Sequence, residues 1–150
     1  MAIENENPCA AVARLAIASV FVFAARMYVL AVPNEAVARA LTSRTIERSG
    51  VRKGAHVGEL ATAKRWGVAV ERASVRLFST RCVPQCLAGL WLLRALGYQP
   101  QARIGVPTHT VANGFAAHVW LELAGNAIIG SDETGQFLSL QSVRDANNDQ

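Results

Sequence analysis

Residues 82–97 read CVPQCLAGLWLLRALG, an apolar segment that begins with a cysteine. Proline is tolerated in the first turn of a helix, and glycine commonly ends one. Pro84 and Gly97 therefore bound a predicted helix that starts near Cys82 and runs through Leu96. Its apolar positions include Leu87, Leu90, Trp91 and Leu93.

The segments on the N-terminal side of Cys82 are also predicted to be helical. Apolar residues fill the run from Ala10 to Val32, which lies between two prolines, and they recur at three- and four-residue spacing further along. The predicted helices span residues 10–32, 35 to about 48, and 59 to about 78. Ser49–Gly58 holds three glycines and two cations and is the predicted internal loop.

After Gly97 the periodicity changes to that of short strands. These strands are expected at Gln101–Val106, Phe115–Leu123 and Ala127–Ile129. The fold class is therefore α+β, with N-terminal helices followed by a small antiparallel sheet. We expect one compact unit made of an N-terminal helical region (1–58), a core (59–140) and a polar tail (141–150).

The composition is apolar and sparsely charged. Of 150 residues, 51% are hydrophobic and 17% are charged, against roughly 25% charged in ordinary soluble domains. This composition excludes a disordered chain and favours apolar surface that a partner covers.

The net charge of +4 arises entirely within residues 1–75. Arg39, Arg44 and Arg48 belong to a basic stretch that ends at Lys53, and they are candidates for contact with an acidic peptide, a protein or phosphates. A solvated helix face followed by a loop accounts for the same pattern. Nucleic-acid binding is not expected, because aromatic residues do not interleave with these cations.

The number of cysteines and the hydropathy of the first helix indicate in which cellular compartment the protein is located. Three cysteines are an odd number in a chain without a cleavable secretion signal, so we predict no disulfide framework and a cytoplasmic location. Arg14 and Arg26 leave only eleven uncharged residues between them, whereas a membrane span needs about 20 apolar residues. We predict a buried or partner-covered helix rather than a span, with interfacial membrane contact as the alternative.

Three residues have the types and positions that nucleophilic catalysis needs. Cys82 at a helix start is near the positive end of the helix dipole, which stabilises a thiolate. Alternation in the strand places His118, Trp120 and Glu122 on one face. Asp132 follows the last predicted strand, where its carboxylate can orient the imidazole.

Each of these residues also has a structural interpretation when it is taken alone: a packed cysteine, a hydrogen-bonded histidine, a turn aspartate. Glu122 and Glu133 remain alternatives to Asp132 as the carboxylate. A zinc site built from Cys82, Cys86 and a histidine is disfavoured, because no second ligand pair lies nearby in the sequence. No metal or cofactor is predicted.

The order helix-start Cys, strand His, strand-end Asp is that of papain-like and transglutaminase-like proteins. The sequence resembles one such family, the leader peptidases (B proteins) of lasso-peptide biosynthesis. The resemblance is carried by RCVPQCLA (81–88), WLLRALG (91–97), RIGV (103–106) and AHVWLE (117–122), followed by Gly125. It covers most of the chain and is strongest between residues 60 and 140.

The resemblance implies that Cys82 is the nucleophile, His118 the base and Asp132 the third member of a catalytic triad. Trp120, Glu122 and Gln85 are candidate supporting residues. The sequence departs from the family pattern at Gln85 and Cys86, where a basic residue and a small residue are expected. Cys86 is thus either a packed side chain or a second nucleophile, and packing is favoured because it lies farther from the helix start.

The resemblance further implies cleavage of a precursor peptide between leader and core, which frees the core amine for macrolactam formation. With 150 residues, the chain is similar to the split, stand-alone form that lacks its own leader-recognition domain. Three partners follow from this form: a separate leader-recognition protein, the precursor peptide and an asparagine-synthetase-like cyclase. The alternatives are a non-catalytic adaptor with the same fold and an acyl transferase with the same triad.

Overall fold

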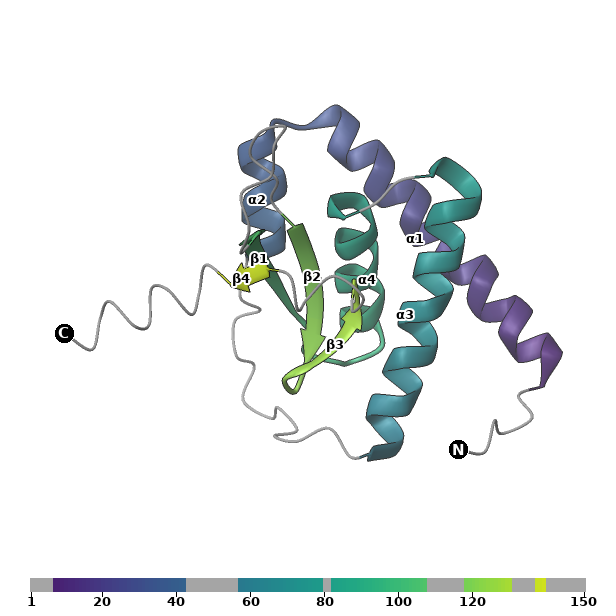
Figure 1. The fold of residues 1–150 in the computed structure, drawn as a ribbon. Coiled ribbons are helices and arrows are strands. Elements are labelled where there is room, and N and C mark those ends of the chain that lie inside the picture. The colour runs from purple at the N-terminus through teal and green to yellow at the C-terminus, as the bar shows by residue number, and fades with distance from the viewer. Residues whose placement is uncertain (1–6, 43–56, 80–81, 108–117, 131–136, 140–150) are drawn as a thin grey trace.

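The computed structural model describes residues 7–42, 57–79, 82–107, 118–130 and 137–139. Helices come first in the chain and strands second, which confirms the predicted α+β class (Figure 1). The helices are α1 (Pro8–Ala31), α2 (Asn34–Thr42), α3 (Val57–Phe78) and α4 (Val83–Ala95). The strands are β1 (Gln101–Pro107), β2 (His118–Leu123), β3 (Asn126–Ile129) and β4 (Phe137–Ser139).

The described strands form one antiparallel sheet in the order β3-β2-β1-β4. β2 is an inner strand, and its first residue, His118, pairs with Gly105 of β1. Pairing on both sides fixes the register of β2. A slip of one residue would turn His118 to the opposite face, so the register decides where this side chain lies.

α4 lies at the centre of the molecule, between the sheet and the other helices (Figure 1). It contacts β2 on one side and α1 and α3 on the other, while α3 also covers β3. Burial on several sides explains why α4 is apolar around most of its circumference. Its fully buried leucines are Leu87, Leu90, Leu92 and Leu93.

The end of α4 follows the sequence prediction. Gly97 has φ +86°, a left-handed conformation that glycine adopts without a steric penalty. The amide of Gly97 donates to the Arg94 carbonyl and the amide of Tyr98 donates to the Leu93 carbonyl. These two bonds form a Schellman motif, which stops the helix and directs the chain into β1.

α1 is largely exposed in the isolated chain. Only Ala18, Val22 and Ala25 are fully buried, where α1 packs against α3 and α4. By length and composition α1 is able to cross a membrane, a test that core helices of soluble proteins also pass. Apolar side chains more than half exposed on α1 are Val12, Val20, Phe23 and Leu30.

Some predicted boundaries differ from the structure. α2 ends at Thr42, and the remainder of the predicted helix to Arg48 lies outside the described residues, as do 115–117 of the predicted strand and the tail 141–150. α3 begins at Val57, within the predicted loop. β4 was not predicted, because a three-residue strand has no periodicity of its own and exists here through its pairing with β1.

Gly67 lies where α3 closely approaches strand β3. A Cβ at this position would overlap the backbone carbonyl of Ile128 and lie 2.9 Å from its Cγ2. We expect Gly67→Ala to lower the free energy of unfolding by about 1–3 kcal/mol, because the added Cβ would overlap strand backbone rather than the end of a flexible side chain. Denaturant unfolding followed by circular dichroism measures this change.

Gly58→Ala is the matched control for that prediction, since Gly58 lies in the same helix and a Cβ there meets nothing within 4 Å. Alanine favours helix by up to about 1 kcal/mol over glycine, so Gly58→Ala should leave stability unchanged or raise it. Equal effects of the two substitutions would show that the α3–β3 contact does not require glycine.

Candidate active site

Cys82 is the N-cap residue of α4 and has a strained backbone, with φ 62° and ψ −103°. A residue with a Cβ rarely adopts this conformation, which costs of the order of 1–3 kcal/mol and is found mainly at functional sites. The first turn is held by the bond from the Cys86 amide to the Cys82 carbonyl, at 2.9 Å. The strain therefore lies at the residue that joins the preceding segment to α4.

His118, the first residue of β2, faces this cysteine. Its Nδ1 atom lies 2.9 Å from the Cys82 Sγ atom, although the two residues are 36 positions apart in sequence. His118 is almost fully buried, and Cys82 is partly exposed. An imidazole at this distance can accept the thiol proton, which gives a thiolate beside an imidazolium.

The backbone of Val119 adds further contacts to both thiols, including one of 3.8 Å between its carbonyl oxygen and the Cys82 Sγ. Its amide lies 3.4 Å from the Cys82 Sγ and donates to it, a contact that favours negative charge on sulfur. Its carbonyl accepts from the Cys86 Sγ at 3.1 Å. The start of β2 therefore contacts both thiols of α4.

The two cysteines of α4 differ in environment. Cys86 is fully buried, and burial raises the pKa of its thiol, with smaller contributions from negative charge at Cys82 and at Glu71. Cys86 is thus held as a neutral thiol that donates to Val119, as expected for a packed residue. The partly exposed Cys82, with its histidine, is the thiol placed for reaction with a ligand.

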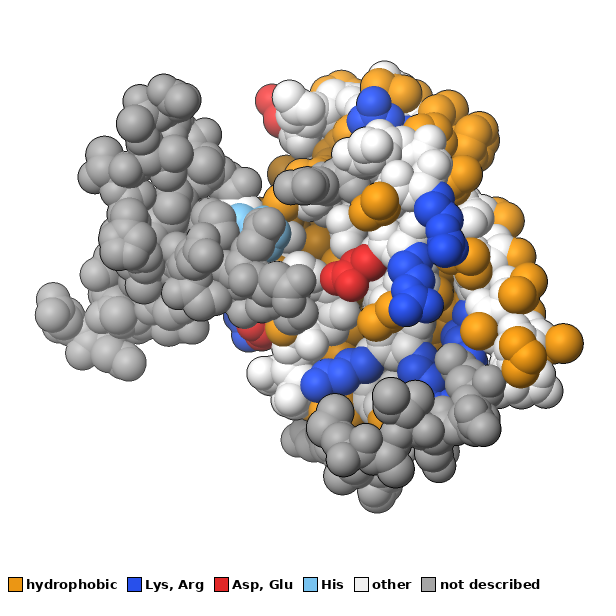
Figure 2. Space-filling model, turned by 45° about the vertical axis from the view of Figure 1, so that its right-hand side comes forward, with side chains coloured by type: hydrophobic (Ala, Val, Ile, Leu, Met, Phe, Trp, Pro, Cys, Tyr) orange, Lys and Arg blue, Asp and Glu red, His pale blue; other side chains and the backbone are white. Residues whose placement is uncertain are grey.

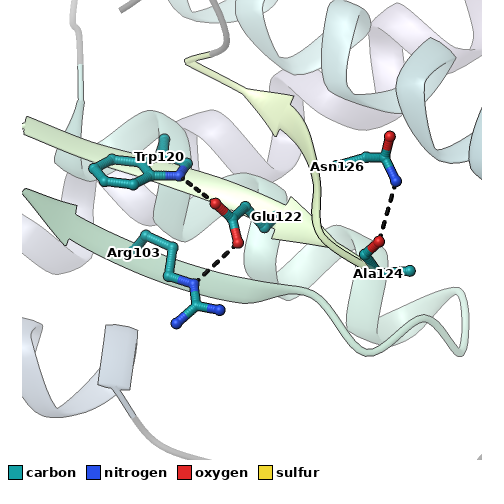
Figure 3. Close-up of polar contacts among 5 residues, drawn as sticks. All are labelled: Arg103, Trp120, Glu122, Ala124 and Asn126. Carbon is teal, nitrogen blue, oxygen red and sulfur yellow. Dashed lines mark hydrogen bonds and ion pairs between the residues drawn. The ribbon is translucent and has the colours of Figure 1, made fainter. Parts of the chain in front are cut away.

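The imidazole of His118 stacks with an aromatic side chain, Trp120, that is itself held by hydrogen bonding. The ring of Trp120 stacks on the imidazole with centroids 6.0 Å apart and an interplanar angle of 15°. Trp120 Nε1 donates to Glu122 Oε1 at 2.8 Å, and Arg103 Nε donates to Glu122 Oε2 at 3.0 Å (Figure 3). Both carboxylate oxygens of Glu122 are thus bound, so this residue orients Trp120 and has a positioning role.

Arg103 was part of a quoted motif, but sequence reasoning gave it no role. It lies on β1 directly opposite Trp120, and the register brings its guanidinium to Glu122 two residues further along β2. Only strand pairing reveals this diagonal contact. The sequence signal was present as the RIGV segment, without a partner assigned to its arginine.

The chain beyond β3 passes beside the other imidazole nitrogen. A Cβ on Gly130 would lie 3.2 Å from His118 Nε2 and 3.2 Å from Trp120 Cβ, and Gly130 has φ +77°. The amide of Gly130 donates to Glu71 Oε1 of α3 at 3.1 Å. Glu71, which sequence reasoning missed, therefore fixes the backbone at the point where it leaves β3.

The remaining predicted residues are placed as follows. Gln85 lies half-buried in the first turn of α4, and Arg39 is exposed on α2. Asp132, Glu133, Arg44 and Arg48 lie outside the described residues. The structure therefore brings Cys82 and His118 together with Trp120 and Glu122, and Asp132 stays a prediction.

The described part of the chain contains no group of three or more His, Cys, Asp and Glu side chains suited to hold a metal ion. Its chemistry is that of a thiol, an imidazole and backbone amides. The first-turn amides of α4 have no partner four residues earlier within the helix, and Cys82 is the N-cap residue of that helix. Such amides are suited to bind an anion that develops beside the thiolate.

A comparison with protein families places this geometry in context. The family model described as "Transglutaminase-like superfamily" matches residues 24–142, which include α2, α3, α4 and the whole sheet. The chain belongs to the transglutaminase-like superfamily. Neither a curated protein nor a solved structure gave a match. Members of this superfamily are often cysteine proteases or acyltransferases.

Thiol labelling tests the difference between the cysteines. In a Cys9→Ala background, which removes the exposed cysteine of α1, we expect iodoacetamide to modify Cys82 rapidly at neutral pH and leave Cys86 unmodified. Replacing His118 with alanine should slow the modification about tenfold or more, because the thiol loses its proton acceptor. Intact-mass spectrometry with peptide mapping measures the rate and the site.

Adding Cys82→Ala in the same background is the control and should abolish labelling of the folded protein. Because the pKa of Cys86 is raised, labelling of that residue should require unfolding even in mildly alkaline buffer. Modification of folded Cys86 at a rate similar to that of Cys82 would contradict this assignment.

Glu122→Gln tests the support of His118. The glutamine carbonyl still accepts from Trp120, but the ion pair with Arg103 is lost, so we expect a loss of about 1 kcal/mol in stability. Looser orientation of Trp120 should also lower the Cys82 labelling rate by at least about twofold.

Asn126→Ala is the matched control, since its hydrogen bond to the Ala124 carbonyl lies in the β2–β3 turn away from His118 (Figure 3). It should leave the labelling rate unchanged whatever its effect on stability. A purely structural role for Glu122 would give a lower melting temperature with an unchanged labelling rate.

Proposed function

We propose that this protein is a cytoplasmic cysteine peptidase that removes the leader from a ribosomally made lasso-peptide precursor. The observation that carries the chemistry is the Cys82 Sγ atom 2.9 Å from His118 Nδ1 at a strained helix start. The substrate assignment rests on the sequence resemblance to leader peptidases. The superfamily supplies the coarser class of cysteine peptidases and acyl transferases.

In the proposed first step, the Cys82 thiolate attacks the carbonyl carbon at the leader–core junction. A carbon–sulfur bond forms, and the negative charge moves to the former carbonyl oxygen. Backbone amides of the first turn of α4 are the proposed donors to this oxygen. His118 then gives its proton to the departing amine, the carbon–nitrogen bond breaks, and the core peptide leaves with a free N-terminus.

In the second step, neutral His118 accepts a proton from water, which attacks the thioester carbon. The tetrahedral intermediate collapses with loss of the sulfur, and the leader leaves as a carboxylic acid. The imidazolium and thiolate are then restored. His118 thus acts as acid in the first step and as base in the second.

Asp132 is proposed to complete the triad by binding His118 Nε2. The support is local: Gly130 passes beside Nε2, and Asp132 follows it by two residues in sequence. A carboxylate there would stabilise the imidazolium and hold the ring with Nδ1 toward sulfur. Glu122 does not compete for this role, because Trp120 and Arg103 bind both of its oxygens.

The proposed partners are a separate leader-recognition protein, the precursor peptide and an asparagine-synthetase-like cyclase that uses the freed amine. The basic stretch that contains Arg39, Arg44 and Arg48 is proposed as a contact for the recognition protein or the leader. Of these three arginines, the structure describes Arg39, which is exposed on α2.

The decisive experiment incubates the purified protein with the precursor peptide and the leader-recognition protein from the same gene cluster. We expect two products whose masses sum to that of the precursor plus one water. Cys82→Ala and Cys82→Ser should lower the cleavage rate by a factor of about 1,000 or more. Circular dichroism confirms that both variants are folded.

Cys9→Ala is the matched control, because the same substitution at the exposed cysteine of α1 should leave cleavage unchanged. Cleavage that persists in Cys82→Ala contradicts the proposal. A product mass that includes an added amine instead of water identifies an acyl transferase. If the precursor is not cleaved and Cys82 is not labelled, the protein is a non-catalytic adaptor.

A further inference from the structure

A groove of about 410 Å³ lies between α1 and α3, away from Cys82 and His118. Its cations are Arg14 from α1 and Lys64, Arg65, Arg72 and Arg76 from α3. Among the described residues that line it, none is Asp or Glu. Figure 2 shows Lys and Arg side chains in a line down this side of the molecule, with hydrophobic side chains beside them.

Lys64, Arg72 and Arg76 have no Asp or Glu at the three- or four-residue spacing at which helical ion pairs form. Glu71 directly precedes Arg72, but residues adjacent in sequence do not face each other on a helix. Arg72 and Arg76 are themselves four residues apart, a spacing at which like charges repel. The arrangement therefore forms a concentrated positive surface that an external anionic group would stabilise.

The groove also has an apolar component. Val12 and Leu15 of α1 and Val68 and Ala69 of α3 line it, and Val12 and Val68 are exposed. Lys64, Val68, Arg72 and Arg76 follow one another at four-residue intervals, so they form one ridge of α3. From Lys64 to Arg76 this ridge spans about 18 Å, since each helical residue rises 1.5 Å.

These features select among ligands. A single phosphate is too small to neutralise cations spread over such a length, and it has no use for the apolar side chains. A membrane surface is contacted best by a convex face of a protein, whereas these cations surround a groove. An amphipathic peptide supplies carboxylates on one side and apolar side chains on the other, spaced by successive helical turns.

We infer that the groove between α1 and α3 binds an acidic amphipathic segment of a partner protein. Carboxylates of the segment pair with Lys64, Arg72 and Arg76, and its apolar side chains contact Val12 and Val68. The inference goes beyond the proposed peptidase function, because none of these residues belongs to the Cys82 site.

The test is fluorescence anisotropy with a labelled synthetic helical peptide of about 16 residues, with Leu along one face and Glu flanking it. A peptide with Gln in place of every Glu is the probe control. We expect saturable binding of the Glu peptide that weakens as NaCl rises from about 50 to about 500 mM, and much weaker binding of the Gln peptide.

Arg72→Glu and Arg76→Glu should each weaken binding about three- to tenfold, and together more than either alone. Arg76→Lys keeps the charge and should retain binding. Arg26→Glu on α1 is the matched control, with the same charge change at a residue that does not line the groove. Cys82→Ala should bind with wild-type affinity, so failure of the peptidase proposal leaves this result unaffected.

Equal weakening by Arg26→Glu and Arg76→Glu would show attraction by net charge alone and overturn the inference. Equal binding of the Glu and Gln peptides would overturn it as well. The inference also fails if the Glu peptide does not bind while phosphatidylglycerol vesicles or duplex DNA bind in an Arg76-dependent manner. Melting curves of the variants confirm that each compared protein is folded.

Discussion

The contact between the first turn of α4 and the first residues of β2 is the constraint on which the rest of the structure depends. It brings Cys82 and His118 to hydrogen-bond distance, and it uses the Val119 backbone to contact both thiols of α4. Neither element places its residue alone. The helix start fixes the sulfur and the strand register fixes the imidazole, so the site exists only where α4 packs on a correctly paired β2.

This constraint accounts for much of the apolar composition. A helix whose N-terminus meets an inner strand must be covered on its other sides, and α1 and α3 supply that cover. α4 is therefore apolar because it is enclosed. Enclosure accounts for only part of the apolar character of α1. Its inner stripe of Ala18, Val22 and Ala25 packs on the core, while larger side chains such as Phe23 stay exposed.

Sequence alone predicted the elements whose signal is local. Gly97 marked the end of α4, the alternation in 118–123 predicted β2, and a cysteine before Val83-Pro84 predicted a thiol at a helix start. Contacts between distant elements were not predictable in this way. The bond from Gly130 to Glu71 joins residues 59 positions apart, and Arg103 meets Glu122 only through the pairing of β1 with β2. Periodicity carries no information about either contact.

α3 lies between the candidate active site and the proposed binding groove. Glu71 on one side holds the Gly130 amide, which keeps the backbone beside His118 Nε2 and Trp120. Arg72, the next residue, lines the groove on the other side. Because a helix moves as a rigid unit, any displacement of α3 by a ligand in the groove would also shift Glu71 relative to Gly130. The packing of α3 against β3 at Gly67 opposes such a displacement, since the helix there contacts the Ile128 backbone without an intervening side chain.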